Sequence, residues 1–225
     1  MKDGVILDPP IEHVVWDWNG TLFNDAWLCM DVMNGLLRRH ALPLLTLERY
    51  QRIFDFPVIE YYRRLGFDFT RHSFEELGTA FIRTYEERRL ECDLHDGALA
   101  LLDALRDAGI TQTVLSAYEH RTLVSLLTHF DIIDYFEEVI GIDDHYAGGK
   151  ADKGSAWIAR AQTAPSRILL IGDTLHDVEV AQVMGVRCVL VAGGNQHRDR
   201  LAGAGVPLFD SLRELTDSWL TTLQD

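Results

Sequence analysis

Three polar residues stand at the ends of hydrophobic, strand-like runs. Asp17 follows "VVW", Ser116 follows "TVL" and Asp173 follows "ILLIG". In a doubly wound parallel sheet, the carboxyl ends of the central strands border the crevice in which ligands bind. We therefore expect these three side chains, which come from distant segments, to meet at one place.

A second carboxylate accompanies Asp173. Asp177 lies four residues later in "IGDTLHD", so both carboxylates can point into the crevice if a helix begins in this loop. Asp17, Asp173 and Asp177 would then form an all-oxygen site, which suits Mg²⁺.

The turn-rich segment "YAGGKADKG" adds two lysines, Lys150 and Lys153. A lysine here could offset the negative charge between a carboxylate and a phosphate group. An aspartate, a magnesium site, a lysine and a small hydroxyl are the parts that an aspartyl-phosphate mechanism needs.

Strand-like runs alternate with helical patterns along most of the chain, which predicts an α/β fold with a doubly wound parallel sheet. The expected strands are residues 12–17, 111–115, 138–142, 167–172 and 187–191. No internal repeat or flexible linker interrupts this pattern.

Only helical patterns lie between the first two expected strands: residues 24–40, 46–54, 57–65 and 73–90. Gly66 is placed as a helix stop. We expect an all-helical cap of residues 24–90, inserted into a Rossmann-like core of residues 1–23 and 91–225. A helix over 96–108 returns the chain to that core.

The order "DWNGT", "LSA", a lysine and "GDTLHD" resembles the haloacid dehalogenase-like (HAD) hydrolase superfamily. The chain is most similar to its phosphoglycolate-phosphatase-like branch, in which a helical cap follows the first strand. The resemblance extends from about residue 12 to the last helix.

The resemblance implies that Asp17 is the nucleophile and takes up the phosphoryl group as a phospho-aspartate. It implies that Thr21 steadies the loop, and that Ser116 and the backbone amide of Ala117 bind phosphate. The site lysine would be Lys150, which lies 23 residues before Asp173 where Lys153 lies 20 before it, because the family usually shows the longer gap.

For the metal, the resemblance implies that Asp173 is a ligand of Mg²⁺, that Asp177 supports the site, and that the main-chain carbonyl of Asn19 contributes a further oxygen. Asn19 also departs from the family pattern, which usually has a second aspartate at this position as the general acid and base. An amide cannot transfer that proton, and losing a general acid costs about 10²- to 10⁴-fold in rate.

The missing general acid at Asn19 could be compensated in two ways. The leaving group can be one that needs little protonation, or the acid can come from elsewhere, with His176 and His145 as the nearest candidates in the sequence.

Several of these residues also have structural interpretations. Ser116 with Glu119, and Thr174 with Asp177, fit the capping-box pattern of a helix start. Residues 54–69 are interpreted as the core of the cap, with Arg63 and Arg64 on its solvent-exposed face. Alternatively, an aromatic or arginine side chain of this stretch could close over the substrate. Residues 192–198, "AGGNQHR", read as a loop.

Composition restricts the partners. The net charge of −14 would repel a nucleic-acid backbone at long range, so no nucleic-acid partner is expected. No apolar run approaches the roughly 18 residues of a membrane span, and a cytoplasmic enzyme is expected. Three scattered cysteines, Cys29, Cys92 and Cys188, suggest neither a disulfide framework nor a zinc site.

The sequence therefore predicts a Mg²⁺-dependent phosphatase that hydrolyses a small phosphorylated metabolite of the phosphoglycolate type through phospho-Asp17. One alternative is a poorly catalytic protein that binds a phosphate ligand for regulation. Another is a dehalogenase, in which the aspartate attacks carbon without a metal. The oligomeric state is left open.

Overall fold

The computed structural model describes residues 10–142 and 149–222. Its strands form one six-stranded sheet in the order β3-β2-β1-β4-β5-β6, and every neighbouring pair is parallel. The strands are β1 (His13–Trp16), β2 (Thr111–Glu119), β3 (Glu138–Ile142), β4 (Ile168–Gly172), β5 (Arg187–Val191) and β6 (Leu208–Phe209). The prediction of a doubly wound parallel sheet is confirmed.

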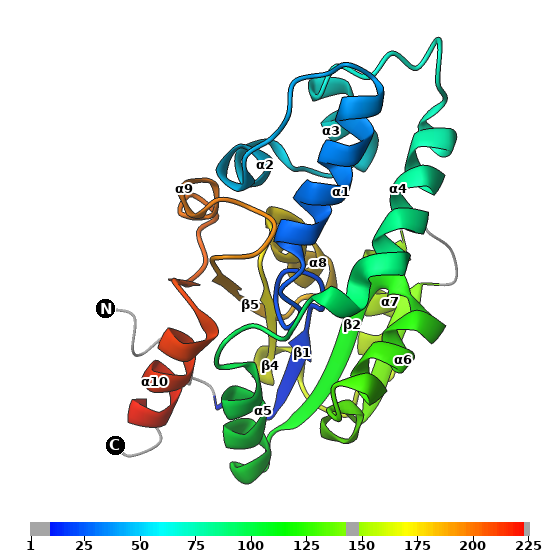
Figure 1. Cartoon of the computed structure of the whole chain (residues 1–225). Coiled ribbons are helices and arrows are strands. Elements are labelled where there is room, and N and C mark those ends of the chain that lie inside the picture. Colours follow the sequence, from blue (N-terminus) through cyan, green and yellow to red (C-terminus); the bar gives the residue numbers. More distant parts are fainter. Residues whose placement is uncertain (1–9, 143–148, 223–225) are drawn as a thin grey trace.

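Helices cover both faces of this sheet (Figure 1). In order along the chain they are α5 (Ala98–Asp107), α6 (His120–His129), α7 (Lys150–Ile158), α8 (Leu175–Met184), α9 (Arg198–Leu201) and α10 (Leu212–Thr222), with short 3₁₀ turns η1 (Arg89–Glu91), η2 (Ile133–Tyr135) and η4 (Pro165–Arg167).

Side chains of β1 alternate between two hydrophobic clusters, as the pleat of a strand requires. Val14 and Trp16 pack with residues of α5, α6 and α10. Val15 packs on the opposite face with residues of α7 and α8. Burial on both faces explains why β1 and β4 are mainly hydrophobic runs without polar alternation.

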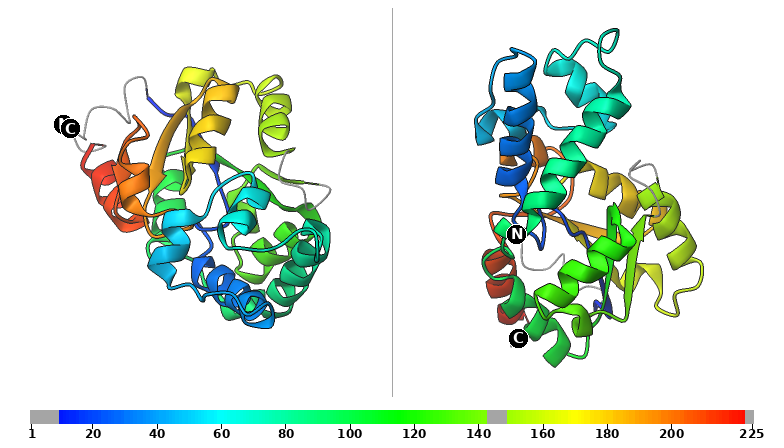
Figure 2. Two further views of the ribbon diagram at one scale, coloured as in Figure 1. Left: turned by 90° about the horizontal axis from the view of Figure 1, so that it is seen from above. Right: turned by 45° about the vertical axis from the view of Figure 1, so that its right-hand side comes forward.

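Four helices fill the segment between β1 and α5: α1 (Ala26–Arg39), α2 (Leu47–Ile53), α3 (Val58–Arg64) and α4 (Phe74–Arg88). They bury a cluster of their own that includes Met33, Leu37, Tyr61 and Leu77. The helical cap stands above the carboxyl edge of the sheet (Figures 1 and 2). The expected boundary at residues 24 and 90 stays a prediction.

Local signals account for the ends of these helices. Ser73 and Glu76 form a capping box at the start of α4. Gly66 follows α3 with a φ of 93°, a left-handed conformation that favours glycine and ends the helix as predicted.

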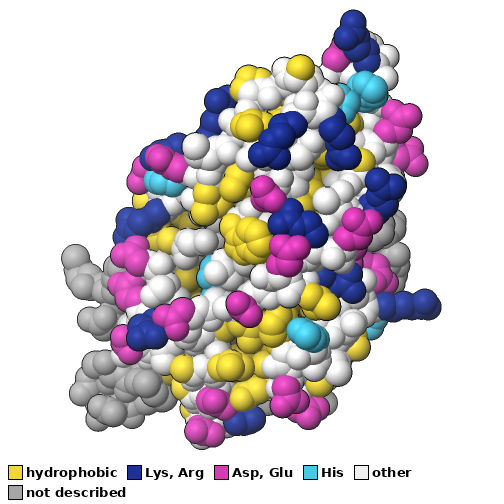
Figure 3. Space-filling view, viewed as in Figure 1, with side chains coloured by type: hydrophobic (Ala, Val, Ile, Leu, Met, Phe, Trp, Pro, Cys, Tyr) yellow, Lys and Arg dark blue, Asp and Glu magenta, His cyan; other side chains and the backbone are white. Residues whose placement is uncertain are grey.

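On the face seen in Figure 3, acidic and basic side chains are interspersed with apolar atoms. Within the residues that the structure describes, no helix is both long and apolar enough to cross a membrane. The absence of a nucleic-acid partner stays a prediction.

Candidate active site

The strand register brings the three predicted polar residues to one edge. Trp16 pairs with Val114 on one side and with Ile171 on the other. Asp17 is one residue past Trp16 and Asp173 is two past Ile171, so they leave adjacent strands at the same edge of the sheet, offset by one residue. Ser116 lies at the same edge but within β2, because the strand continues through a register shift to Glu119. The capping-box interpretation of Ser116 is therefore wrong, and Glu119 caps α6 instead.

Asp17, Asp173 and Asp177 form a buried cluster. One carboxylate oxygen from each lies within 4.8 Å of the others. The Lys150 ammonium lies 2.6 Å from Asp17 Oδ1 and 2.5 Å from Asp177 Oδ1. The residues that were expected to share a site thus lie together, although Asp17 and Asp173 directly follow β1 and β4, and Asp177 and Lys150 belong to α8 and α7.

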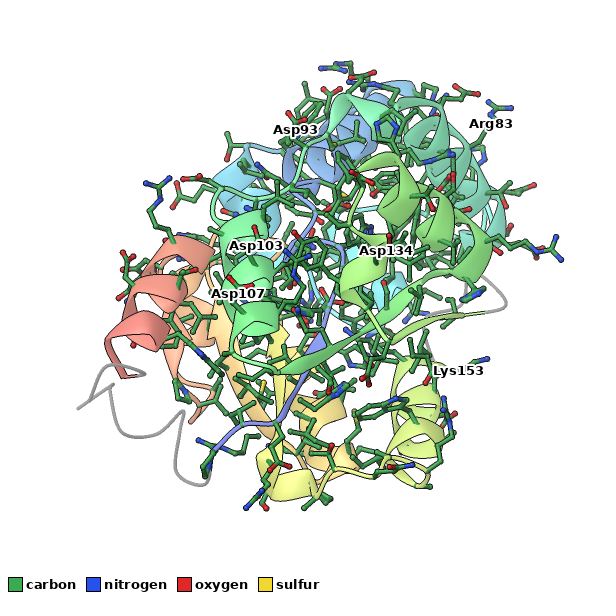
Figure 4. The ribbon with its side chains drawn as sticks, turned by 90° about the horizontal axis from the view of Figure 1, so that it is seen from below. Arg83, Asp93, Asp103, Asp107, Asp134 and Lys153 are labelled. Atoms are coloured by element: carbon green, nitrogen blue, oxygen red, sulfur yellow. The ribbon has the colours of Figure 1, made fainter. Side chains whose placement is uncertain are left out.

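The other lysine lies apart from this cluster. Lys153 is one turn further along α7 and does not line the cavity above Asp17. Figure 4 shows its side chain at the edge of the molecule, directed outward.

Thr174 and Asp177 form a capping box at the start of α8. The Asp177 Oδ2 atom accepts hydrogen bonds from the Thr174 amide at 3.0 Å and the Thr174 hydroxyl at 2.6 Å. Its Oδ1 atom accepts one from Lys150. Asp177 can therefore cap α8 and also belong to the site, because its two carboxylate oxygens have different partners.

Burial dominates the electrostatics of the cluster. It raises the pKa of Asp17, and for Asp173 the nearby charges of Asp17 and Asp177 raise the pKa further. Burial also opposes the ionised forms of Asp177 and Lys150. However, their mutual attraction lowers the pKa of Asp177, and the two carboxylates around Lys150 raise its pKa.

This donor set fits a divalent cation. With all three carboxylates ionised, the single Lys150 ammonium leaves two negative charges buried without compensation. Carboxylate and carbonyl oxygens are the ligands that Mg²⁺ prefers. Asp173, Asp17 and the Asn19 carbonyl could hold it, with Asp177 and Lys150 alongside.

The loop after β1 is tightly folded. The Trp18 carbonyl accepts hydrogen bonds from the amides of Thr21, Leu22 and Phe23, and the Thr21 hydroxyl donates to Asp17 Oδ2 at 3.0 Å. Gly20 has a φ of 81° and lies so close to Asp173 that an added Cβ would overlap its carboxylate. The close approach to Asp173 and the positive φ thus require glycine at position 20.

The Asn19 side chain is turned toward the cap. Its amide donates to Asp25 Oδ2 at 2.8 Å and to the Tyr85 hydroxyl oxygen at 3.0 Å. The Tyr85 hydroxyl in turn donates to Asp25 at 2.6 Å, and the Gly20 amide donates to the other Asp25 oxygen at 2.9 Å. Asp25 is fully buried, and burial raises its pKa.

Sequence reasoning missed this network and one further contact. Asp25 directly precedes α1, as a helix-capping residue would, yet its side chain makes no capping hydrogen bond to that helix. Asn195, from the segment read as a loop, donates to the Asn19 carbonyl at 3.1 Å, and its backbone amide donates to Asp173. The position of this loop directly after β5, at the carboxyl edge, was the signal that could have identified it.

A cavity of about 240 Å³ lies above Asp17. Ser116 and Ala117 line it, and the Ser116 hydroxyl oxygen accepts a hydrogen bond from the Tyr118 amide. His176 also lines it, with one ring nitrogen 3.1 Å from Glu179. His145, the other proposed acid, lies outside the described residues.

Residues 54–69 contribute to the cavity with apolar side chains. Tyr61 and Tyr62 are buried and line it. Arg63 and Arg64 are exposed and form ion pairs with Glu60 and Asp55. The aromatic side chains of this stretch therefore cover the site, and its arginines face outward.

The comparisons with known proteins agree with this architecture. Over 188 residues, the chain is 29% identical to the tyrosine-protein kinase PtkA of Mycobacterium tuberculosis. The matched segment covers 83% of this chain but only 64% of that protein. The chain is 25% identical to the N-acetylmuramic acid 6-phosphate phosphatase of Pseudomonas aeruginosa, over 92% of this chain and 94% of that one.

Among solved structures, a haloacid dehalogenase-like hydrolase from Streptococcus pneumoniae superposes with a TM-score of 0.78 at 16% identity, covering 93% of this chain and 98% of that one. At this identity, the likeness shows a shared fold. The family model for haloacid dehalogenase-like hydrolases matches residues 14–191, which include Asp17, Lys150, Asp173 and Asp177. The chain therefore belongs to the haloacid dehalogenase-like hydrolase family.

Proposed function

We propose that this protein is a Mg²⁺-dependent phosphatase that hydrolyses a small phosphorylated substrate through a phospho-aspartate on Asp17. The observation that carries the proposal is the contact of the Asp17 carboxylate with Lys150 inside a cluster of buried acids. The phosphatase named above among its relatives acts on a phosphomonoester, as its name states. This supports the same reaction class.

In the proposed reaction, one Asp17 oxygen attacks phosphorus, and the bond between phosphorus and the leaving oxygen breaks. Lys150 offsets the charge that the phosphoryl group brings beside Asp17. Thr21 holds the other Asp17 oxygen in place through its 3.0 Å hydrogen bond. Ser116 and the Ala117 amide, which line the cavity, bind phosphate oxygens.

A water molecule then attacks the phospho-aspartate, which frees Asp17 and inorganic phosphate. The proton that this water loses balances the one taken up by the leaving oxygen. Mg²⁺, held by Asp17, Asp173 and the Asn19 carbonyl, would supply positive charge against the phosphoryl oxygens. The cap would exclude bulk water while these steps proceed.

A phosphate-binding protein with poor turnover is the second candidate, and Asn19 is the observation that favours it. The Asn19 amide is held by Asp25 and Tyr85 and cannot act as an acid. Dehalogenation is less well supported, because an attack on carbon does not need the cluster of three carboxylates.

Release of inorganic phosphate from p-nitrophenyl phosphate and a panel of phosphorylated metabolites, with Mg²⁺ and with EDTA, tests the proposal. We expect turnover with Mg²⁺ alone and its loss in Asp17→Asn, which keeps the size of the side chain. Thermal melts of both proteins verify folding. Mg²⁺-dependent binding of a phosphate mimic without any turnover would favour the binding protein, and turnover that persists in EDTA would contradict the metal site.

A further inference from the structure

The wall of the cavity above Asp17 is mostly aromatic and apolar. All four cap helices contribute to it, with Met33 from α1, Tyr50 from α2, Tyr61 from α3 and Phe81 from α4, and Phe54 adds a ring from the loop after α2. Tyr50 and Tyr61 contact each other edge to face, with 5.9 Å between ring centroids. Such a wall favours a flat apolar group in the bound ligand.

The charged groups of the same cavity are nearly all acidic. Glu119 and Asp25 line it in addition to the carboxylate cluster, as does Glu86, which is paired with Arg89 at 2.6 Å. Lys150 is the sole lysine or arginine among the described residues of its lining. Lys150 is already in contact with Asp17 and Asp177. A carboxylate on the leaving group would be desolvated here beside other acids, which is costly. This lining disfavours phosphoglycolate itself.

The site also restricts the chemistry of the leaving oxygen. Asn19 occupies the place of the family's acid, and its amide points away to Asp25 and Tyr85. A leaving group that departs here without a proton must be a stable anion. Phenols have a pKa of about 10, whereas an alkoxide is nearly as basic as hydroxide, whose conjugate acid has a pKa of about 16.

From these observations, we propose that the substrate is an aryl phosphate, the phosphate ester of a phenol whose remainder carries no negative charge. This inference rests on the proposed function. Asp17 attacks phosphorus, the bond to the phenolic oxygen breaks with its electron pair, and phenolate leaves and takes a proton from water. The ring occupies the apolar cavity, whose 240 Å³ exceeds the roughly 150 Å³ of an engineered cavity that binds benzene.

A second cavity, of about 750 Å³, adjoins the first. Phe56, Val58, Ile82 and His176 line both. The outer cavity also has Glu75 and Glu179 in its lining, and no lysine or arginine among its described residues. A substituent on the ring can therefore extend outward between α3, α4 and α8, and a neutral or cationic substituent fits these walls.

The inference is tested with phosphate esters matched in shape: phenyl, benzyl and cyclohexyl phosphate, with 2-phosphoglycolate as the small anionic ester. We expect kcat/KM for phenyl phosphate to exceed that for cyclohexyl phosphate by about 10²-fold or more, the range of a missing general acid. Benzyl phosphate should resemble phenyl phosphate in KM and the cyclohexyl ester in kcat. A capped phosphotyrosine peptide distinguishes a phenol carried by a peptide from a free one.

Substituted phenyl phosphates then test the leaving group directly. In the natural protein, log(kcat/KM) should rise steeply as the phenol pKa falls. In Asn19→Asp, the slope should flatten, because the aspartate can protonate the leaving oxygen. A flat slope in both proteins would overturn the inference.

Two apolar-to-lysine variants test the charge argument. Ile82→Lys places a cation in the lining of both cavities and should improve kcat/KM for phosphoglycolate about tenfold relative to phenyl phosphate, by lowering KM. Val183→Lys, at an exposed position of α8, is the matched control and should leave this ratio unchanged.

Failure of the inference and failure of the proposed function have different signatures. Equal turnover of phenyl and cyclohexyl phosphate, or a preference for phosphoglycolate, would overturn the aryl-phosphate assignment and leave the phosphatase intact. No turnover of any ester by a folded protein that binds a phosphate mimic would overturn both.

Discussion

The Asn19 amide donates a hydrogen bond to the buried carboxylate of Asp25 at a distance of 2.8 Å. The residue in the position of the family's acid is therefore fixed by an acid six residues later, on the side of the cap. This contact determines what happens when the usual aspartate is restored.

Asn19→Asp should increase the turnover of alkyl phosphates by about 10²-fold, since a carboxyl group can transfer the proton that an amide cannot. It also places two carboxyl groups side by side, so one of them must keep its proton. We expect a loss of about 1–3 kcal/mol in the free energy of unfolding, measured by urea denaturation. The double variant Asn19→Asp/Asp25→Asn, which again pairs one amide with one carboxylate, should recover most of that stability.

Lys150→Met should lower kcat by about 10²- to 10³-fold, because the ammonium that contacts both Asp17 and Asp177 is lost. Lys153→Met removes a lysine from the same helix without touching the cavity. Its kcat should stay within about twofold of the natural value, inside the small range of surface substitutions. Equal losses in both variants would contradict the placement of Lys150 as the site lysine.

Two tyrosines of the cap form a matched pair for stability. The Tyr50 hydroxyl donates to Asn195 Oδ1 at 2.8 Å, whereas the buried Tyr61 hydroxyl has no hydrogen-bond partner among the described residues. Tyr50→Phe leaves a buried acceptor unsatisfied and should cost about 1–3 kcal/mol. Tyr61→Phe should change the free energy of unfolding by less than about 0.5 kcal/mol. Equal changes in the free energy of unfolding for the two variants would contradict the different roles assigned to the two hydroxyls.

His13 should make the fold sensitive to acid. Burial lowers the pKa of this histidine from 6.5 to about 4, and its ring nitrogens contact the Thr111 and Thr113 hydroxyls. Its contribution is present above pH 6.5 and is lost as the pH falls toward 4, because the unfolded chain then binds the proton more readily. Between pH 7 and pH 5, the natural protein should lose about 2 kcal/mol more than His13→Gln, measured by chemical denaturation. If the free energy of unfolding of the natural protein and of His13→Gln changed with pH in parallel, the assignment to His13 would be refuted.

The sequence predicted β1 and β4 well because burial on both faces makes each of them a mainly apolar run. The last strand, β6, escaped prediction because its two residues, Leu208 and Phe209, are too short to show a period. The capping pattern at Ser116 predicted a helix start that is not there, because β2 continues through a register shift to Glu119. That continuation depends on the pairing of β2 with β3, which is not visible in the local sequence.

Within the site, motif order was enough to select Asp17, Asp173 and Asp177, and the family's usual spacing selected Lys150 over Lys153. The fold brings these four residues together. The surroundings of Asn19 could not be read in the same way. They depend on Tyr85, 66 residues further along the chain, and on Asn195, 176 residues further along. Contacts of this kind are decided by how the cap packs on the core, which no local pattern encodes.

The two connections between core and cap lie side by side. The Asn24 amide donates to the Asp93 carbonyl at 2.9 Å, the His95 amide donates to the Leu22 carbonyl at 2.8 Å, and Phe23 and Leu94 form an antiparallel bridge. The chain thus leaves and re-enters the core at nearly the same point. A helical segment of another length or lining can be grafted between these positions, and Asp17 keeps its place where the graft retains the Asp25 and Tyr85 contacts to the loop after β1. Selection or design can then exchange substrate preference while the reacting groups stay in place.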